Sequence, residues 1–151
     1  MDTLELNRTV TARGFLGAFA YDEIPQRLKD VPFSFIVNTS PSNMPGDHWI
    51  AMVYDKQTFY FLDSYGRKSN DTTLPKQFSA TIKKYIGQNR VKHNSTWLQQ
   101  LTSNTCGEYC VYFLQEFEKV GFKKSLHVFS KNLKTNDKFV LNYVRKLYKY
   151  K

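Results

Sequence analysis

Three short runs of aromatic and β-branched residues lie close together in the first half of the chain. They span residues 33–38, 48–54 and 59–63, and polar or turn-forming residues separate them. Runs of this composition, about four to eight residues long, are typical of buried strands. The polar segment at residues 55–57 is short enough to join the second and third runs as a hairpin. The sequence therefore predicts three consecutive antiparallel strands.

A helical periodicity follows the strands. Apolar residues recur at intervals of three and four positions in three later segments, which indicates helices with one face in the core. The second helix is expected to begin at Cys106 and to stop at Gly121, and the third to begin near Asn136. The apolar positions are Phe78, Ile82, Tyr85 and Ile86, then Cys110, Val111, Phe113, Leu114 and Phe117, and finally Phe139, Val140, Tyr143, Val144 and Leu147.

The remaining segments carry weaker patterns. Residues 14–17 and 21–25 are interpreted as loop or short helix, and Val91 is a candidate for a further short strand. Residues 95–105 are polar and without periodicity, which predicts a loop directly before the helix at Cys106. Since no repeat or linker interrupts the chain, residues 1–151 are expected to form a single domain.

Composition excludes several classes of protein. A chain with 41% hydrophobic and 16% aromatic residues can bury enough surface to fold, which excludes global disorder. No apolar run approaches the length of a membrane span, and no export signal is recognisable, so we expect a soluble protein. Two cysteines cannot form a disulfide framework, and a four-ligand zinc site would need nearly all of the two cysteines and three histidines to converge, so no metal is expected. A reducing compartment is expected.

Basic residues are concentrated at the C-terminal end of the sequence. Residues 118–151 contain ten lysine or arginine residues against two acidic ones, whereas the preceding residues are nearly neutral. Such a segment attracts polyanions through long-range electrostatics and counterion release. Arg145, Lys146 and Lys149 on the last predicted helix are therefore candidate DNA contacts. A solvated helix face without a partner is an equally open interpretation.

Three residues suited to nucleophilic catalysis lie at the ends of predicted elements. His48 opens one strand, Asp63 closes the next, and Cys106 begins a helix after a polar loop. The positive end of a helix dipole favours a thiolate over a thiol. An imidazole can hold and return a proton, and a carboxylate can orient that imidazole. The three residues are therefore a candidate Cys-His-Asp catalytic group.

Spacing alone leaves a noncatalytic interpretation open. In that interpretation Cys106 is a buried core residue, His48 ends a strand and Asp63 is exposed. Cys110 lies on the apolar side of the same predicted helix and is expected to be a core residue. Two further histidines have no partner motif and are expected to be surface or packing residues, namely His93 and His127.

Several blocks of sequence form a pattern when they are taken in order. They are Gly-Asp-His-Trp-Ile-Ala-Met at residues 46–52, Tyr-Phe-Leu-Asp-Ser-Tyr-Gly at 60–66, and Gln99 followed by Ser-Asn-Thr-Cys-Gly-Glu-Tyr-Cys at 103–110, with Phe-Leu-Gly at 15–17, Tyr-Asp at 21–22 and Ile-Val-Asn-Thr at 36–39 upstream. From about Gly14 to Phe117 these blocks resemble the maturation proteases of adenoviruses, the adenain family. The pattern is most similar to the shorter proteases of virophages and of Maverick or Polinton transposons, and more distantly to SUMO-processing proteases.

The resemblance implies roles for individual residues. It makes Cys106 the nucleophile, His48 the general base and acid, and Asp63 the group that orients the imidazole. The adenovirus proteases carry glutamate in place of Asp63, whereas the SUMO-type proteases carry aspartate. Gln99 would donate from its side-chain amide to the oxyanion, together with the backbone N–H of Cys106, and Gln100 is the alternative donor. The residues expected to contact substrate are Trp49, Gly46 and Gly107.

The resemblance also implies a fold and a function. The fold would be α+β, related to papain, with a central mixed, largely antiparallel sheet packed against helices and the nucleophile at the N-terminus of a core helix. The activity would be that of a cysteine endopeptidase that cleaves capsid precursor proteins during particle maturation. The expected location is the virion and the compartment of particle assembly, either a cytoplasmic viral factory or the nucleus.

Cofactors and partners follow from the same resemblance. No cofactor is expected to be required, although DNA or a short viral peptide would stimulate the enzyme. Both cysteines fall in the predicted nucleophile helix, so the chain offers no separate thiol to link such a peptide. Nonspecific DNA contact, no membrane contact and a monomeric state are expected. Two other functions are open, namely a protease that deconjugates ubiquitin or SUMO and a noncatalytic basic DNA-binding domain.

Overall fold

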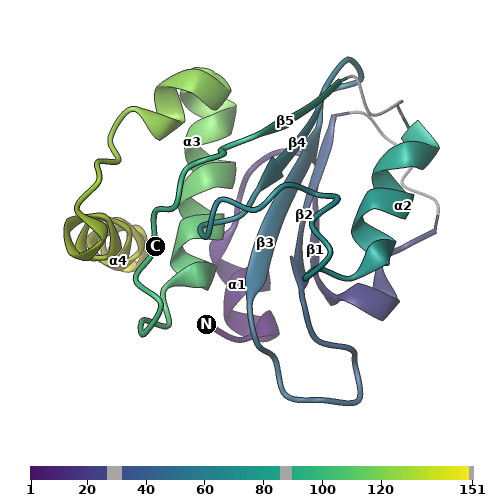
Figure 1. Cartoon of the computed structure of the whole chain (residues 1–151). Helices are drawn as coiled ribbons and strands as arrows, with labels where there is room; N and C mark the ends of the chain where they lie inside the picture. The colour runs from purple at the N-terminus through teal and green to yellow at the C-terminus, as the bar shows by residue number, and fades with distance from the viewer. Residues whose placement is uncertain (27–31, 86–89, 150–151) are drawn as a thin grey trace.

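The computed structural model describes residues 1–26, 32–85 and 90–149 and is built around a five-stranded mixed sheet (Figure 1). The strands lie in the order β1-β2-β3-β4-β5. The two central pairings, β2 with β3 and β3 with β4, are antiparallel, and the two outer pairings are parallel. The strands are β1 (Phe15–Ala20), β2 (Phe33–Asn38), β3 (Trp49–Tyr54), β4 (Phe59–Leu62) and β5 (Val91–His93).

The three central strands confirm the predicted ones, and every residue in them is buried. Since side chains alternate between the two faces of a strand, each strand contributes to two separate cores. In β3, Ala51 and Val53 belong to one core, whereas Ile50 and Met52 belong to the other. Burial on both faces explains why these strands are continuous apolar runs in the sequence.

Helices cover both faces of the sheet (Figure 1). Helices α1 (Thr3–Thr9), α3 (Cys106–Leu126) and α4 (Leu133–Lys149) contribute to the core on one face. Helix α2 (Lys76–Tyr85) and the short 3-10 helix η1 (Tyr21–Glu23) pack on the opposite face. The combination of a mixed sheet and packed helices confirms the predicted α+β class, with Cys106 as the first residue of a core helix.

The structure corrects one interpretation near the N-terminus and adds a helix that no sequence pattern predicted. Of residues 14–17, interpreted as loop or short helix, all but Gly14 instead form the first half of strand β1, which pairs parallel to β2. The polar N-terminal residues form helix α1, because Asp2 and Glu5 make a capping box and Leu6 supplies a buried anchor. Residues 21–25 begin with a short helix, as expected.

The later helices agree with the predictions except at their ends. Gly121, the expected stop of α3, has a φ of 83° and breaks the helical geometry, but helix resumes beyond it as far as Leu126. Helix α4 begins at Leu133, earlier than the predicted start near Asn136. Ile86, assigned to the stripe of α2, lies outside the described residues. Within the described ranges, no helix has both the length and the apolar character needed to span a membrane.

Candidate active site

Three chain segments bring His48, Asp63 and Cys106 to one edge of the sheet. His48 immediately precedes β3, and Asp63 immediately follows β4. Because β3 and β4 are antiparallel, the start of the first strand lies beside the end of the second. Helix α3 packs against the same edge with Cys106 in its first turn. The structure therefore brings together the three residues that the sequence analysis proposed as a catalytic group.

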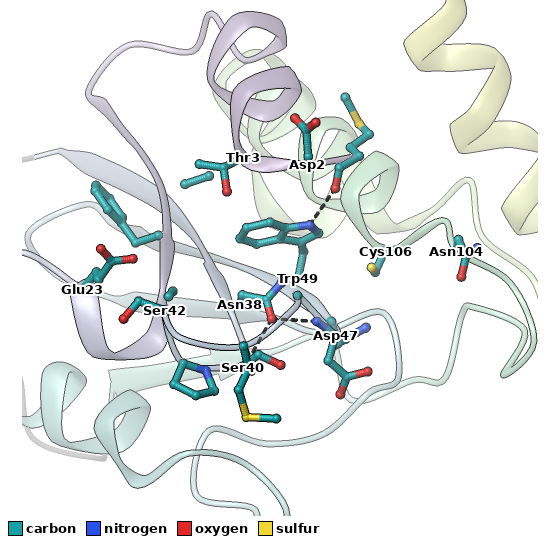
Figure 2. A pocket seen from close by; sticks show the side chains of 18 of the residues that line it. Asp2, Thr3, Glu23, Asn38, Ser40, Ser42, Asp47, Trp49, Asn104 and Cys106 are labelled. Carbon is teal, nitrogen blue, oxygen red and sulfur yellow. Dashed lines mark hydrogen bonds between the residues drawn. The ribbon is translucent and has the colours of Figure 1, made fainter.

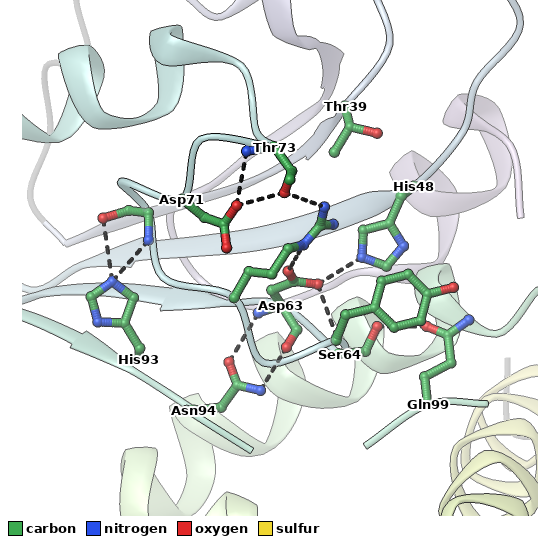
Figure 3. A network of polar contacts seen from close by, with 12 residues as sticks. Thr39, His48, Asp63, Ser64, Asp71, Thr73, His93, Asn94 and Gln99 are labelled. Atoms are coloured by element: carbon green, nitrogen blue, oxygen red, sulfur yellow. Dashed lines mark hydrogen bonds and ion pairs between the residues drawn. The ribbon is translucent and has the colours of Figure 1, made fainter. Parts of the chain in front are cut away.

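His48 and Asp63 form a close buried pair (Figure 3). The Nε2 atom of His48 lies 2.7 Å from Oδ1 of Asp63, and both side chains are almost fully buried. The noncatalytic interpretation required an exposed Asp63, and the buried position of this side chain contradicts it. Burial by itself would raise the pKa of Asp63, but hydrogen bonds and nearby positive charges hold this pKa below its usual value. The hydrogen bond from His48 has the largest lowering effect. Asp63 is therefore a carboxylate, and Nε2 of His48 is the donor.

Asp63 occupies only one of the two ring nitrogens of His48. Because Nε2 is held by Asp63, Nδ1 is the nitrogen available to Cys106. Burial disfavours a charged imidazole, but hydrogen bonds to Asp63 and Cys106 and electrostatic interactions with both groups outweigh it and raise the pKa of His48 to about 9. At neutral pH the imidazole is accordingly an imidazolium that can give a proton from Nδ1.

Asp63 has further partners that the sequence analysis did not identify. The Nε atom of Arg67 donates to Oδ2 of Asp63 at 2.7 Å, and the backbone N–H of Tyr65 donates to Oδ1 at 3.0 Å. Asn94 binds the backbone of Asp63 twice, since its Oδ1 accepts from the Asp63 N–H and its Nδ2 donates to the Asp63 carbonyl (Figure 3). The carboxylate is fixed in position and orientation before any substrate binds.

An aromatic stack covers the imidazole. The ring of Tyr65 lies nearly parallel to the His48 ring, with the centroids 4.4 Å apart and an interplanar angle of 13°. The ring centroids of Trp97 and Tyr65 lie 5.1 Å apart, and the guanidinium carbon of Arg67 lies 5.7 Å from the Tyr65 ring centroid. The stack limits the access of water to the His48 and Asp63 pair and restricts rotation of the imidazole.

The two candidate oxyanion donors lie in different surroundings. Gln99 is 1% exposed and lines the same cavity as Cys106. Its Oε1 accepts from the Ser64 hydroxyl at 2.5 Å, and its Nε2 donates to the Ser103 carbonyl at 3.0 Å, which leaves one N–H of the amide for another acceptor. Gln100 instead donates from Nε2 to Oδ2 of Asp137 at 3.1 Å.

A cavity of about 880 Å³ opens beside Cys106 (Figure 2). Trp49 lines it and donates from Nε1 to the backbone carbonyl of Met1 at 2.9 Å, although most of the indole belongs to the core. Gly46 also lines the cavity. Gly107, the third predicted substrate contact, faces Met1 instead, and an added Cβ there would lie only 3.0 Å from the Cβ of Met1. Its lack of a side chain serves this packing.

The other predicted positions lie away from this cavity. Cys110 is 1% exposed, and burial raises the pKa of its thiol well above the usual value, as expected of a core residue. His93 is partly buried and accepts from the Ser69 backbone N–H at 3.0 Å, whereas His127 is exposed. In the part of the chain that is described, no group of three or more potential ligand residues could hold a metal ion. The three candidate DNA contacts Arg145, Lys146 and Lys149 are exposed on α4.

Replacing Arg67 by methionine is expected to lower the free energy of unfolding by about 2 kcal/mol, because a buried carboxylate loses a charged hydrogen-bond donor. Since the pKa of Asp63 is lowered in the folded protein, this contribution to stability is fully present at pH values above the ordinary pKa of 3.8. It is lost as the pH falls through the lower pKa that Asp63 has in the folded protein. Urea denaturation at pH 7 measures the effect. Lys68→Met, at an exposed neighbour, is the control, and equal losses in both variants would contradict the assignment.

Two solved structures resemble this fold. ChlaDub1 from Chlamydia trachomatis superposes with a TM-score of 0.53 and 14% identity, over 77% of this chain and 58% of that one. The central domain of Lpg1148 from Legionella pneumophila gives a TM-score of 0.52 and 9% identity, over 97% and 98% of the two chains. At these identities the likeness concerns the fold alone.

Comparison of sequences identifies the family. The protease of bovine adenovirus 7 is 30% identical over 126 residues, and that of bovine adenovirus 4 is 29% identical over 117 residues. The alignments cover 77% and 70% of this chain but only 62% and 57% of those proteases. Residues 15–136 match the family described as adenovirus endoprotease. The resemblance seen in the sequence motifs is thereby confirmed, and the chain belongs to the adenovirus endoprotease family.

Proposed function

We propose that this protein is a cysteine endopeptidase that cleaves virus-like capsid precursor proteins during particle maturation. One observation carries the proposal: the imidazole of His48 is held by a buried carboxylate beside a cysteine at the start of a helix, in the wall of a cavity. Membership of the adenovirus endoprotease family supports the same chemistry and a viral protein substrate.

In the proposed reaction the sulfur of Cys106, having given its proton to Nδ1 of His48, attacks the scissile carbonyl carbon, and an electron pair of the C=O bond moves to the oxygen. When the tetrahedral intermediate collapses, the C–N bond breaks and Nδ1 of His48 gives its proton to the leaving amine. A water molecule then attacks the thioester while His48 accepts its proton, and Cys106 is released. Asp63 remains ionised throughout and keeps Nε2 of His48 as a donor.

The negative oxygen needs donors that are fixed in advance. We propose Gln99 rather than Gln100 for this role, together with the backbone N–H of Cys106. Each amide nitrogen keeps one N–H beyond its contact, but that of Gln100 is held at Asp137, which does not line the cavity, whereas Ser64 fixes the amide oxygen of Gln99. Gln99 also shares the cavity wall with Cys106.

The experiment is incubation of the protein with the capsid precursor encoded in the same genome, followed by mass mapping of new termini. New termini that are absent with Cys106→Ala would support the proposal. Turnover of a ubiquitin or SUMO conjugate, with no cleavage of the precursor, would select the deconjugating function instead. DNA binding by a protein that cleaves neither substrate would select the noncatalytic one.

The pH dependence of cleavage is expected to show the raised pKa of His48. Because the imidazolium is the acid that protonates the leaving amine, kcat/KM should fall as the pH rises through about 9. Asp63→Asn removes the carboxylate that most favours the charged imidazole, so the fall should move to lower pH by about one unit or more. Initial rates with a fluorogenic peptide between pH 6 and 10 measure both curves. Coincident descending limbs would contradict this account of His48.

We further propose that DNA is a nonspecific partner held by α4. The support is the set of exposed cations on this helix, whose buried residues Val140 and Val144 lie on another side. DNA would concentrate the enzyme and its substrate within a particle and raise the cleavage rate. The proposed locations remain the virion and the viral factory or nucleus in which particles assemble.

Reversing the charges of Arg145, Lys146 and Lys149 to glutamate is expected to weaken DNA binding without unfolding the protein. The plot of log affinity against log salt concentration should become less steep by about two to three, because each phosphate contact contributes about 0.9 to the steepness. Fluorescence anisotropy with duplexes of two unrelated sequences at several salt concentrations measures it. The matched control reverses three exposed lysines of α2, on the opposite face of the sheet, namely Lys76, Lys83 and Lys84. An unchanged slope in the α4 variant would assign these charges to solubility.

A further inference from the structure

A buried carboxylate outside the candidate catalytic group lies at the start of α4. Asp137 is 4% exposed, and in the described ranges no lysine, arginine or histidine forms an ion pair with it. A buried carboxylate without a cation is costly unless hydrogen bonds satisfy its oxygens. Such a group at this position calls for an account of what it holds.

The donors to Asp137 come from two elements near Cys106. Its Oδ2 accepts from Nε2 of Gln100 at 3.1 Å and from the Gln100 backbone N–H at 3.4 Å. Its Oδ1 accepts from the hydroxyls of Thr105 at 3.1 Å and Tyr109 at 2.8 Å. Burial, and then the hydrogen bond to Asp137, raise the pKa of Tyr109, so this hydroxyl stays protonated and can donate.

These contacts hold one loop, residues 98–105, along its whole length. The loop connects the segment after β5 to α3, and it ends at Thr105, the residue before Cys106. Asn136, the neighbour of Asp137, donates to the carbonyl of Leu98 at 3.2 Å. The start of α4 therefore contacts the beginning, the middle and the end of the loop.

The same loop carries the proposed oxyanion donor, Gln99. On the side of the sheet, Ser64 fixes the amide oxygen of Gln99 and accepts the Gln99 backbone N–H at its carbonyl, 3.1 Å away. On the side of α4, Asp137 fixes the backbone and side chain of the adjacent Gln100. The amide of Gln99 is thus held between two anchors that belong to different parts of the fold.

We propose that Asp137 is a positioning residue that keeps the loop 98–105, and with it Gln99, in the geometry required to bind the oxyanion. The proposal rests on the cysteine peptidase function proposed above. It assigns a task to a buried acidic side chain that touches neither substrate nor the reacting atoms. It also makes the start of α4, far from the catalytic group in sequence, part of the support of the site.

The test begins with Asp137→Asn, which preserves shape but replaces one acceptor oxygen by an amide donor that faces the donors of the loop. With a peptide substrate, kcat should fall by about tenfold or more. The fall should not exceed the roughly 10²- to 10³-fold that is lost when an oxyanion donor is removed. KM should stay within about twofold of the wild-type value, because the lost interaction is made mainly in the transition state. Tyr109→Phe removes one donor from Asp137, together with a contact to the Leu98 carbonyl of the loop, and should also lower kcat, by a smaller factor.

Alkylation of Cys106 separates positioning of the oxyanion donor from general damage. Iodoacetamide reacts with the sulfur without forming an oxyanion on a carbonyl, so its rate in Asp137→Asn should match the wild type within about twofold. Lys138→Met, at the exposed neighbour, should match the wild type in both kcat and alkylation. An unchanged kcat in Asp137→Asn overturns the proposal. A loss of alkylation parallel to the loss of kcat also overturns it, because Asp137 would then act on the thiol itself.

Amide hydrogen exchange tests the anchor without any substrate. In Asp137→Asn the amides of residues 99–105 should exchange about tenfold faster or more, while those in the middle of α3 keep their protection. If wild-type protein cleaves no peptide, the proposed function fails, yet this measurement still decides whether Asp137 holds the loop. Unchanged exchange in the loop overturns the proposal, and acceleration confined to the loop supports it.

Discussion

Cys106→Ala is expected to abolish peptide cleavage, with a fall in kcat of at least about 10⁴-fold. The sulfur is the only atom in the proposed mechanism that bonds to the substrate, and neither His48 nor Asp63 can replace it. The measurement is single-turnover cleavage of a fluorogenic peptide at high enzyme concentration. Binding of the uncleaved peptide should be retained, since the Cβ of alanine leaves the cavity wall intact.

Cys110→Ala is the matched control for this result. Cys110 lies one helical turn further along α3 and is 1% exposed in the core. Its replacement should leave kcat within about threefold of the wild type and cost about 1 to 2 kcal/mol of stability, because a small cavity forms. Comparable residual activity in the two variants would remove Cys106 from its proposed role.

The central part of the fold is predictable because local pattern and burial agree there. Strands β2, β3 and β4 are buried on both faces, so nearly every position in them is apolar or aromatic and the run is visible in the sequence. Strand β1 is missed because Gly17 interrupts it and Gly14 directly precedes it, a composition more typical of a loop. Helix α1 is missed because it is too short and too polar to show a stripe, and its capping box is its main signal.

The candidate site is predictable only in its reactive residues. His48, Asp63 and Cys106 stand out because they are unusual residue types at the ends of elements. Their supports are ordinary polar residues, and the partners lie far apart in the chain. Ser64 and Gln99 are 35 positions apart, and Gln100 and Asp137 are 37 apart. No periodicity links such pairs, so only the folded structure reveals them.

Arg67 had a weak signal in the sequence. It lies four residues after Asp63, in the segment that follows β4, and an acidic and a basic residue at this spacing commonly interact. That rule applies to helices, however, and the segment was not expected to be one. The contact arises because the chain turns directly after β4, where the Gly66 N–H donates to the Asp63 carbonyl at 2.7 Å. Gly66 has a φ of 74°, which favours glycine.

His48→Ala is expected to lower kcat by about 10³-fold or more and to slow alkylation of Cys106 by iodoacetamide at pH 6 by about tenfold or more. An ordinary thiol, with a pKa of about 8.5, is less than about 1% ionised at pH 6 and reacts slowly. In the wild type the pKa of His48 is about 9, so the imidazole is charged at this pH, and an adjacent positive charge generally speeds alkylation of a cysteine. Removing the ring removes both that charge and the proton donor for the leaving amine.

Mass spectrometry after timed exposure to iodoacetamide measures the rate at each cysteine separately. Cys110 provides an internal control, because its burial should protect it in both proteins. Asp63→Asn should give an intermediate rate, since it weakens the imidazolium but keeps the ring. If wild type and His48→Ala are alkylated equally fast at Cys106, and both rates follow the titration of an ordinary thiol, then His48 and Cys106 are not a preformed pair. The loss of activity in His48→Ala would then have to come from proton transfer alone.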